Sequence, residues 1–456
     1  MAKYNLVPVD VPKVNTKYRK IKTKLPVPES LNIFRVLSES EPVSMMGQPP
    51  VVWHKAKGFQ VYDKWGNKWL DWSSGVLITN AGHSRKKIIK ALRDLLDQKL
   101  LSTYVFVHEK RAELTKMLQG ISPDPSNYLV FLLSTGSEAT ENCIKLAKTY
   151  AFEKYGPQKK YLVSFNHAFH GRTLGAQLAG GNARLKTWIV DEGKTFIQVP
   201  FPDGYKNEDT SFGLFLKSLE DQGIKPAEIA GIITESYQGV GPNFLPVEYA
   251  KKLEAFCLEH DIVSIFDEVQ AGFGRTGKMF CFEHYGIKPD LIACGKGISS
   301  SLPISAVIGR KDIMGLYPPG SMTSTHSGSP LPVVAAVESL KMIKKEKLVE
   351  NARKLGEILI PELARIRNKY PDVLGCMQGL GLVAGIQVVK KGTKVPDSET
   401  ALKINEKCFH KGLLMFAPVG IAGECLKIAP PLNTTEEALM EGIKVFEEAC
   451  DEILGH

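Results

Sequence analysis

Two apolar segments in the second half of the chain each run into charged side chains, and this pattern constrains the fold more than any other sequence feature. Residues 262–266 are followed by Asp267 and Glu268, and residues 290–294 are followed by Lys296 between two glycines. Both segments are predicted to be buried strands, because interior strands of an α/β sheet are near-continuous apolar runs. Open α/β sheets bind ligands beyond the carboxyl ends of their strands. A carboxylate and an amine are therefore predicted to share a site at that edge.

Strand and helix patterns alternate on the amino-terminal side of these two segments. Residues 161–165, 196–199 and 229–234 have the apolar character of strands, and residues 212–219 and 247–260 have that of amphipathic helices. Such alternation predicts an α/β fold with a mainly parallel sheet and right-handed crossovers.

Residues 267–278 contain two motifs that suggest nucleotide binding. Residues 272–277 spell GxGxxG and, with Lys278, GxxxxGK, while Asp267 follows a strand as the magnesium-binding acid of a P-loop ATPase does. Met279, however, stands where a P-loop needs Ser or Thr, and the glycines follow the acidic strand instead of preceding it. The residues after them are aromatic-rich and unlike a phosphate-binding helix. These features argue against both nucleotide hydrolysis and dinucleotide binding.

Residues 266–280 (FDEVQAGFGRTGKMF) and 289–310 (PDLIACGKGISSSLPISAVIGR) together resemble the signature of the class III (subgroup II) aminotransferases. This family includes the 4-aminobutyrate and ornithine aminotransferases, and the resemblance extends from about residue 58 to the end of the chain. It implies a pyridoxal 5'-phosphate (PLP) enzyme in which Lys296 carries the cofactor as a Schiff base. Asp267 would hold the pyridine nitrogen protonated. The glycines around Lys296 give its backbone the freedom that a mobile amine needs.

The resemblance also implies the PLP-dependent transferase fold type I. This fold has a large domain, with a mainly parallel seven-stranded sheet flanked by helices, and a smaller α/β domain formed by both termini. A chain of 456 residues suits such a division. We expect residues 1–75 to form an N-terminal arm and a β-meander that packs with the small domain. Residues 76–335 would form the PLP-binding domain, and residues 336–456 the C-terminal small domain.

Thr135, Gly136 and Ser137 lie where an apolar strand runs into a helix. Free N–H groups and the helix dipole make such a turn an anion site, although a plain N-cap would use the same residue types. In the resembling family the equivalent turn holds the PLP phosphate, and these three residues are assigned to that role.

Residues 166–173 resemble the family's aromatic-x-Gly-Arg-Thr turn. The resemblance implies that Phe169 stacks on one face of the cofactor ring, with His170 as the next wall. Val269 would press on the opposite face, and Gln270 would bond the phenolic oxygen. Without the resemblance, Phe169 would be interpreted as a core residue.

Arg172 is predicted to bind the acidic end of a substrate, because its planar guanidinium fits an acidic group with two hydrogen bonds. A structural ion pair is the alternative.

Val76 belongs to the family's loop into the active site. Glu235 matches the first residue of the family's Glu-Pro-x-Gln-Gly segment, with Ser236 in place of proline. Val76 and Glu235 are also assigned to the substrate site.

Two positions depart from the aminobutyrate and ornithine enzymes. Those enzymes bind the α-carboxylate with an Arg before Pro-Pro-Leu, and a Glu after Gln-Gly pairs with that Arg. Here the positions hold Lys427 and Val240, and a lysine lacks the bidentate fork. The changes predict an ω-amino acid donor, such as 4-aminobutyrate, β-alanine or taurine, with 2-oxoglutarate or pyruvate as acceptor. Lys427 is retained as a substrate-binding candidate.

Other PLP chemistry remains open on the same fold. An amino-acid racemase or epimerase, or a phospholyase acting on a phosphorylated amine, needs the same Lys–Asp pair and no second keto substrate. A non-catalytic regulatory protein is less favoured, because both Lys296 and Asp267 are present and no DNA-binding domain is appended.

The resemblance further implies a homodimer, or a dimer of dimers, with shared active sites. Residues 324–328 match the turn that reaches the cofactor phosphate of the neighbouring subunit, and Thr325 would be the ligand across the interface.

Composition predicts a soluble, cytoplasmic protein that binds neither membranes nor nucleic acid. Apolar residues make up 43% and charged residues 23%, and no apolar run is long enough to span a bilayer. Much of the net charge of +9 lies in the first 24 residues, which are interpreted as a packed or flexible arm. The eight cysteines and ten histidines show no metal-ligand spacing, so reduced core thiols and no metal site are predicted.

Overall fold

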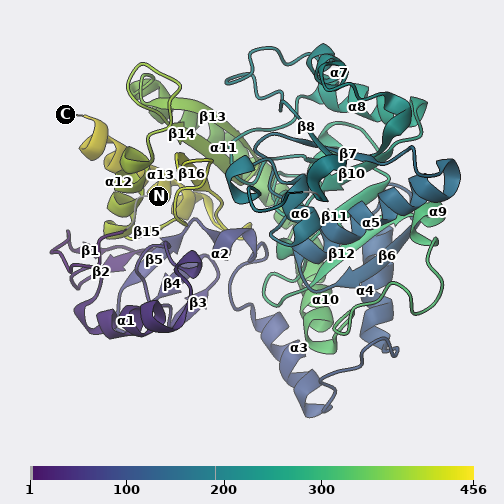
Figure 1. Cartoon of the computed structure of the whole chain (residues 1–456). Helices are drawn as coiled ribbons and strands as arrows, with labels where there is room; N and C mark the ends of the chain where they lie inside the picture. The colour runs from purple at the N-terminus through teal and green to yellow at the C-terminus, as the bar shows by residue number, and fades with distance from the viewer. Residues whose placement is uncertain (1–3, 191, 456) are drawn as a thin grey trace. The chain divides into compact units, whose positions relative to one another are not determined.

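The computed structural model describes residues 4–190 and 192–455 (Figure 1). The chain forms two compact units. Unit 2 consists of residues 86–350, and unit 1 combines residues up to 85 with residues from 351 onward. The sequence placed these boundaries at 75/76 and 335/336.

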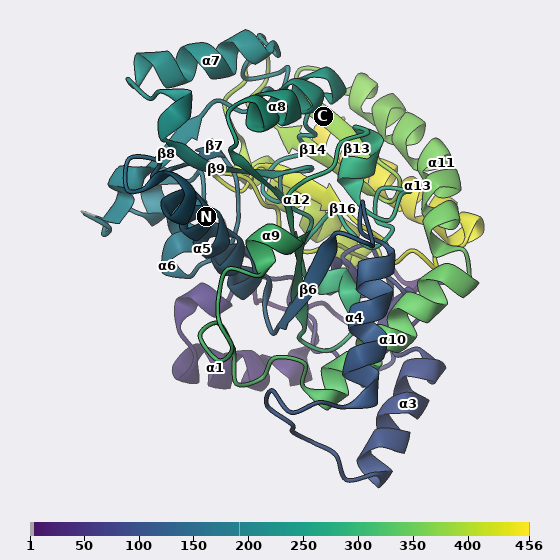
Figure 2. The same cartoon turned by 90° about the vertical axis from the view of Figure 1, so that its right-hand side faces the viewer.

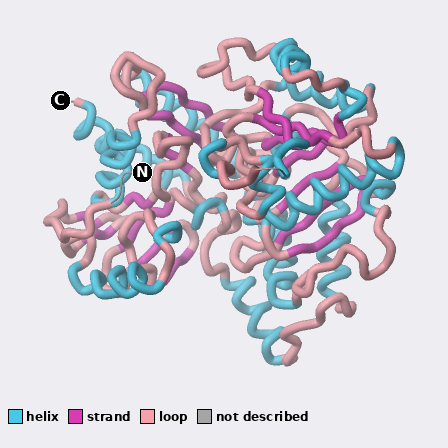
Figure 3. Tube along the Cα trace, viewed as in Figure 1, coloured by secondary structure: helices cyan, strands magenta, loops and turns pink. Residues whose placement is uncertain are grey.

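Unit 2 is built on a seven-stranded sheet with the strand order β6-β12-β11-β10-β9-β7-β8, in which helices flank the strands (Figure 3). Neighbouring strands from β11 to β8 are parallel, whereas β12 is antiparallel to both β11 and β6. The predicted α/β fold with a mainly parallel sheet is confirmed. The strands are β6 (Tyr128–Leu133), β7 (Tyr161–Phe165), β8 (Phe196–Val199), β9 (Ile229–Glu235), β10 (Val263–Asp267), β11 (Leu291–Cys294) and β12 (Ser305–Arg310).

Strands β9 and β10 form the centre of this sheet, and every residue of both is buried. Their register pairs Asp267 with Glu235 on one side and with Ala293 of β11 on the other. The carboxyl ends of three neighbouring strands therefore coincide, which places their last side chains at one edge of the sheet.

The helices of unit 2 bury apolar faces against this sheet or against one another. Helix α5 contacts β9, β10, β11 and β12, and α10 contacts both α3 and α4, beside which it lies in two views (Figures 1 and 2). The helices are α3 (Lys86–Asp97), α4 (Glu109–Gly120), α5 (Gly136–Tyr155), α6 (Leu174–Ala179), α7 (Phe212–Asp221), α8 (Val247–Glu259), α9 (Lys311–Met314) and α10 (Pro330–Lys345).

Unit 1 is the smaller α/β domain and contains segments from both ends of the chain, as predicted. Its six-stranded sheet comprises β1 (Val14–Asn15), β2 (Lys20–Ile21), β3 (Lys55–Lys57), β4 (Gln60–Tyr62), β5 (Lys68–Asp71) and β15 (Leu413–Leu414). A three-stranded sheet comprises β13 (Leu374–Leu380), β14 (Val383–Val388) and β16 (Cys425–Ile428). The helices are α1 (Leu31–Ser40), α2 (Ser74–Leu77), α11 (Leu348–Lys369, which crosses the boundary between the units), α12 (Ser398–His410) and α13 (Glu436–Leu454).

The basic N-terminal segment is packed within unit 1. The Tyr4 hydroxyl donates to Asn405 Oδ1 at 2.6 Å, and Arg19 Nε lies 2.6 Å from the Glu441 carboxylate. Tyr18 donates to Glu437 at 2.7 Å. Of the packed and flexible alternatives, the structure shows the packed arm for the residues that it describes.

Candidate active site

A cavity of about 210 Å³ opens at the carboxyl ends of β9, β10 and β11 in unit 2. All the residues predicted to bind the cofactor, except Thr325, line this cavity, and so does Glu235. The lining residues are Thr135, Gly136, Ser137, Phe169, His170, Gly171, Glu235, Asp267, Val269, Gln270 and Lys296. Residues separated by up to 161 positions in the sequence therefore line one cavity, and Asp267 and Lys296 are both among them.

Asp267 forms the acidic end of the site and is held by two donors. Its Oδ1 accepts from the Val269 backbone N–H at 3.0 Å, and its Oδ2 accepts from His170 Nδ1 at 2.8 Å. Burial disfavours the charged form of His170, but the hydrogen bond and the charge of Asp267 outweigh it and raise the pKa of the imidazole. Thr140 Oγ1 of α5 donates to the His170 carbonyl at 2.7 Å, so the helix also positions the residue that orients the acid.

Lys296 provides the amine of the site, directly after β11. Burial lowers the pKa of this amine, while the nearby charges of Asp267 and Glu235 oppose the change. The backbone of Lys296 is left-handed, with φ of 43°, a conformation that costs a non-glycine residue energy and is tolerated at active sites. An amine with a lowered pKa is more often unprotonated and so more nucleophilic.

Three glycines leave room beside the N-terminus of α5. A Cβ at Gly136 would lie 2.9 Å from Val269 Cγ1, and one at Gly295 would lie 3.2 Å from the same atom. A Cβ at Gly171 would lie 2.3 Å from Ser137 Oγ. Side chains at these positions would fill the cavity, so glycine keeps the helix terminus accessible to a ligand.

The N-terminus of α5 has the form of an anion site. Thr135 caps the helix by accepting from the Glu138 N–H at 3.2 Å, and Glu138 accepts in return from the Thr135 N–H at 2.8 Å. The N–H groups of the first helical turn after the cap have no intrahelical acceptor and, with the helix dipole, favour a phosphate. The cap leaves the backbone N–H groups of Gly136 and Ser137 available, so Thr135 can be a plain N-cap in a turn that also suits a phosphate.

Phe169 lines the cavity, and Arg172, which is not itself part of the lining, contacts the Phe169 ring. Phe169 is only partly buried, unlike a core residue, and the Arg172 guanidinium lies over its ring at 5.4 Å from the centroid. Arg172 is exposed and forms no ion pair with the residues that the structure describes. The described residues therefore do not show the alternative, a structural ion pair of Arg172, and its guanidinium is free to bind an anion.

Besides Arg172, three predicted site residues do not line the cavity. Thr325 of unit 2 is exposed, in the loop between α9 and α10. Val76 lies in unit 1, where it is 40% exposed within the left-handed turn of α2. Lys427, also in unit 1, is fully buried in β16 opposite Gly385. Their assignments remain predictions from the family resemblance.

The sequence did not predict the contacts that Glu235 makes in the site. Its Oε2 accepts from the Phe169 N–H at 2.9 Å and its Oε1 from the Gly239 N–H at 2.6 Å. Burial raises the pKa of this carboxyl to about 7, an effect that the charge of His170 opposes and that of Asp267 reinforces. The match to the family's Glu-Pro-x-Gln-Gly segment marked Glu235 as a site residue, but its backbone partners left no signal in the sequence.

The arrangement fits PLP. The cofactor needs an amine to condense with its aldehyde, an acid for its ring nitrogen, flat walls for its ring and an anion site for its phosphate. Lys296, Asp267, the pair Phe169 and Val269, and the glycine-lined terminus of α5 supply these groups around one cavity. The fold and the site together define a PLP-dependent transferase of fold type I.

Comparisons with known proteins agree with this class. The family model for class III aminotransferases matches residues 43–450. A 4-aminobutyrate aminotransferase of Mycobacterium leprae is 29% identical over 94% of this chain and 97% of its own. An alanine/serine racemase of Pyrococcus horikoshii is 30% identical over 99% and 96%. The structure of Toxoplasma gondii ornithine aminotransferase, described with partial occupancy of PLP at its active site, has a TM-score of 0.81 at 26% identity and covers 94% of this chain and 96% of its own.

The chain belongs to the class III aminotransferase family, whose members depend on PLP. Among the residues that the structure describes, no helix is long and apolar enough to cross a membrane.

Proposed function

We propose that this enzyme transfers the amino group of an ω-amino acid to an α-keto acid. The donor class is 4-aminobutyrate, β-alanine, taurine or a similar compound, and the acceptor is 2-oxoglutarate or pyruvate. The observation that carries this proposal is the position of Arg172. Its exposed guanidinium lies over the ring of Phe169, a residue of the cavity lining, and has no acidic partner in the described chain. An ω-amino acid carries its acid group at a distance from the reacting carbon, so it can place that group against the Arg172 guanidinium.

The residues of the cavity have separate roles in this reaction. Bound PLP supplies a conjugated ring that withdraws electrons from the substrate carbon bearing the amine. Asp267 would hold the proton on the ring nitrogen, and His170 keeps the Asp267 carboxylate oriented. Lys296 Nζ would take the proton from the substrate carbon and deliver it again, a task for which a lowered amine pKa is suited.

Orientation comes from the walls and from the terminus of α5. Thr135, Gly136 and Ser137 would bind the phosphate, and Phe169 and Val269 would fix the plane of the ring. Gln270 is suited to donate to the ring's phenolic oxygen. A fixed ring plane aligns the breaking bond with the conjugated system, which lowers the entropic part of the barrier.

The choice of donor is supported by the two positions that differ from the aminobutyrate and ornithine enzymes. Lys427 is fully buried and Val240 is apolar, so neither offers the carboxylate clamp and its paired acid. Arg172 is then the cation best suited to an acidic donor.

Arg172→Ala tests this proposal with a panel of amine donors and the two keto acids. We expect the KM for acidic ω-amino donors to rise roughly tenfold or more, as for the loss of a charged hydrogen-bonded pair, with little change for uncharged amines. Arg184→Ala, which removes an exposed arginine of unit 2 outside the cavity lining, is the matched control. Unchanged kinetics of Arg172→Ala on acidic donors would contradict the assignment.

A second candidate is a racemase or epimerase, favoured by the alanine/serine racemase relative and by the altered α-carboxylate positions. The two functions differ in their need for a keto acid. A single amino-acid enantiomer incubated with the PLP enzyme alone would be scrambled by a racemase, whereas a transaminase would turn over continuously only when a keto acid is added. Chiral chromatography of the products separates the two.

We also propose that the enzyme acts as a cytoplasmic homodimer in which Thr325 reaches the phosphate of the neighbouring subunit. The exposed position of Thr325 supports this role. The eight cysteines are free thiols, which supports a reducing compartment.

A further inference from the structure

The Glu235 carboxylate joins two segments that approach the cavity from different directions. Phe169 follows β7 and Gly239 lies in the turn after β9, and each gives its backbone N–H to a different oxygen of the carboxylate, at 2.9 and 2.6 Å. An ionised carboxylate is an acceptor only and can satisfy both donors at once. Both oxygens are therefore engaged by the protein itself.

Each of these two segments positions a residue of the cavity lining, Phe169 in one case and Gln270 in the other. The first carries the Phe169 ring, whose backbone the carboxylate fixes. The second lies against Gln270, because a Cβ at Gly239 would be 2.2 Å from Gln270 Nε2 and 3.0 Å from Glu235 Oε1. Gly239 thus permits the Gln270 amide to pack directly on the turn that Glu235 holds.

We propose that Glu235 is a positioning residue that ties Phe169 and the Gly239 turn into one rigid support for the cofactor ring and for Gln270. This role replaces the substrate contact that its place in the sequence indicated. The inference needs only PLP in the cavity and does not depend on which amine is the substrate.

The charges around Glu235 act on the ionisation of its carboxyl in opposite directions. The charge of His170 favours the ionised carboxylate, the charge of Asp267 disfavours it, and the charge of Glu235 in turn acts on Lys296. Burial raises the pKa of Glu235 to about 7. The protonated form would present an O–H to one of the two N–H donors, so one of the two links is lost when the carboxyl is neutral.

Glu235→Gln tests the proposal, because an amide of the same shape offers one acceptor oxygen and sets an NH₂ group against the other donor. The readouts are the PLP dissociation constant by equilibrium dialysis and the visible circular dichroism of bound PLP, both measured without substrate. We expect the dissociation constant to rise roughly tenfold, the loss typical of a charged hydrogen bond, and the dichroism of the ring to fall.

Glu268→Gln is the matched control. Glu268 is as deeply buried, also accepts two backbone N–H groups and has its pKa raised by burial, but it does not line the cavity. We expect it to bind PLP within about twofold of wild type, a change below the 1.4 kcal/mol that a factor of ten represents.

A substrate-binding role for Glu235 makes the opposite prediction. It would leave PLP affinity and dichroism unchanged in Glu235→Gln and alter only the KM of the substrates, and that result overturns the proposal. If Glu235→Gln does not fold, Gly239→Ala serves instead, since its Cβ displaces Gln270 and the carboxylate together. Wild-type PLP affinity and dichroism in Gly239→Ala would equally overturn it.

Discussion

At the residue scale, the buried Glu268 carboxyl, which lies outside the cavity lining, makes the stability of the protein depend on pH. Glu268 accepts from the backbone N–H groups of Cys281 at 2.7 Å and Phe282 at 3.1 Å, and from the Ser236 hydroxyl. The family's proline at position 236 could not donate that last hydrogen bond. Burial nevertheless raises the pKa of Glu268 to about 7, so desolvation outweighs these three bonds.

Glu268→Gln is expected to make the protein's stability less sensitive to pH. The folded-state pKa of Glu268 lies above the ordinary value of 4.5, so the folded protein binds this proton more tightly than the unfolded chain. Stability from this group therefore falls as the pH rises from about 4.5 to about 7. The loss of unfolding free energy between pH 5.5 and pH 8 should be about 2 kcal/mol smaller in the variant, as measured by urea unfolding at both pH values. An equal loss in both proteins would contradict the pKa shift.

The sequence identified Asp267 and Lys296 because a charge at the end of an apolar strand is conspicuous. It could not identify the role of Glu235, because its two backbone N–H donors lie 66 and 4 residues away and any residue except proline could supply them. Similarly, His170 was expected as a wall of the ring, and only the folded chain shows its hydrogen bond to Asp267.

At the scale of elements, apolar periodicity located most strands and helices but not every backbone path. Strand β7 spans Tyr161–Phe165, as predicted. Strand β12 was not predicted, although it lies within the sheet between β6 and β11, because its antiparallel pairing with both depends on distant partners. The loop at Ser74–Leu77 is a left-handed turn with φ of 49° to 62°, which a sequence containing valine does not suggest.

The capping box of α5 makes a prediction at this scale. Thr135→Ala removes the side-chain oxygen that accepts from the Glu138 N–H. The free energy of unfolding should fall by about 1 kcal/mol, the typical cost of losing an N-cap, and can be measured by urea unfolding. Thr173→Ala is the control, because Thr173 occupies the N-cap of α6 without a capping hydrogen bond. Equal effects of the two substitutions would show that the cap of α5 contributes nothing.

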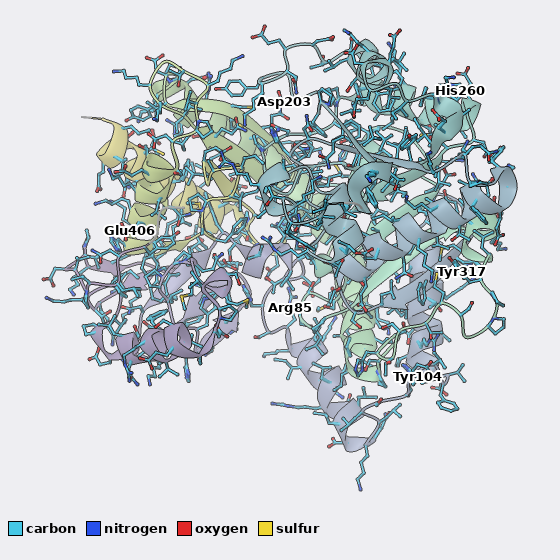
Figure 4. All side chains as sticks on the ribbon, in the orientation of Figure 1. Arg85, Tyr104, Asp203, His260, Tyr317 and Glu406 are labelled. Atoms are coloured by element: carbon cyan, nitrogen blue, oxygen red, sulfur yellow. The ribbon has the colours of Figure 1, made fainter. Side chains whose placement is uncertain are left out.

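At the scale of the whole molecule, one exposed apolar surface is suited to the proposed dimer. It lies in the connection between α3 and α4 in unit 2, where Figure 4 labels Tyr104. Phe106 and Val107 are 76% and 91% exposed there, beside Tyr104 and Val105. Contiguous exposed apolar residues of this kind mark interaction surfaces.

Replacing Phe106 and Val107 together by aspartate should shift the protein from dimer to monomer, because two buried charges would oppose the contact. Light scattering coupled to size-exclusion chromatography measures the mass directly. Leu258, which is 70% exposed elsewhere on unit 2, provides the control substitution Leu258→Asp. A double variant with the mass of the wild-type oligomer would exclude this surface from the interface.

Unit 1 is discontinuous in the chain, and this affects the order in which the protein can form during translation. Residues 86–350 make a contiguous unit that can acquire its structure as soon as it leaves the ribosome. Tyr4 and Arg19, by contrast, must wait for Asn405 and Glu441. At ordinary elongation rates the stretch beyond residue 350 takes roughly 5 to 20 seconds to synthesise. During that interval the nascent N-terminal segment lacks its native neighbours and is exposed to chaperones.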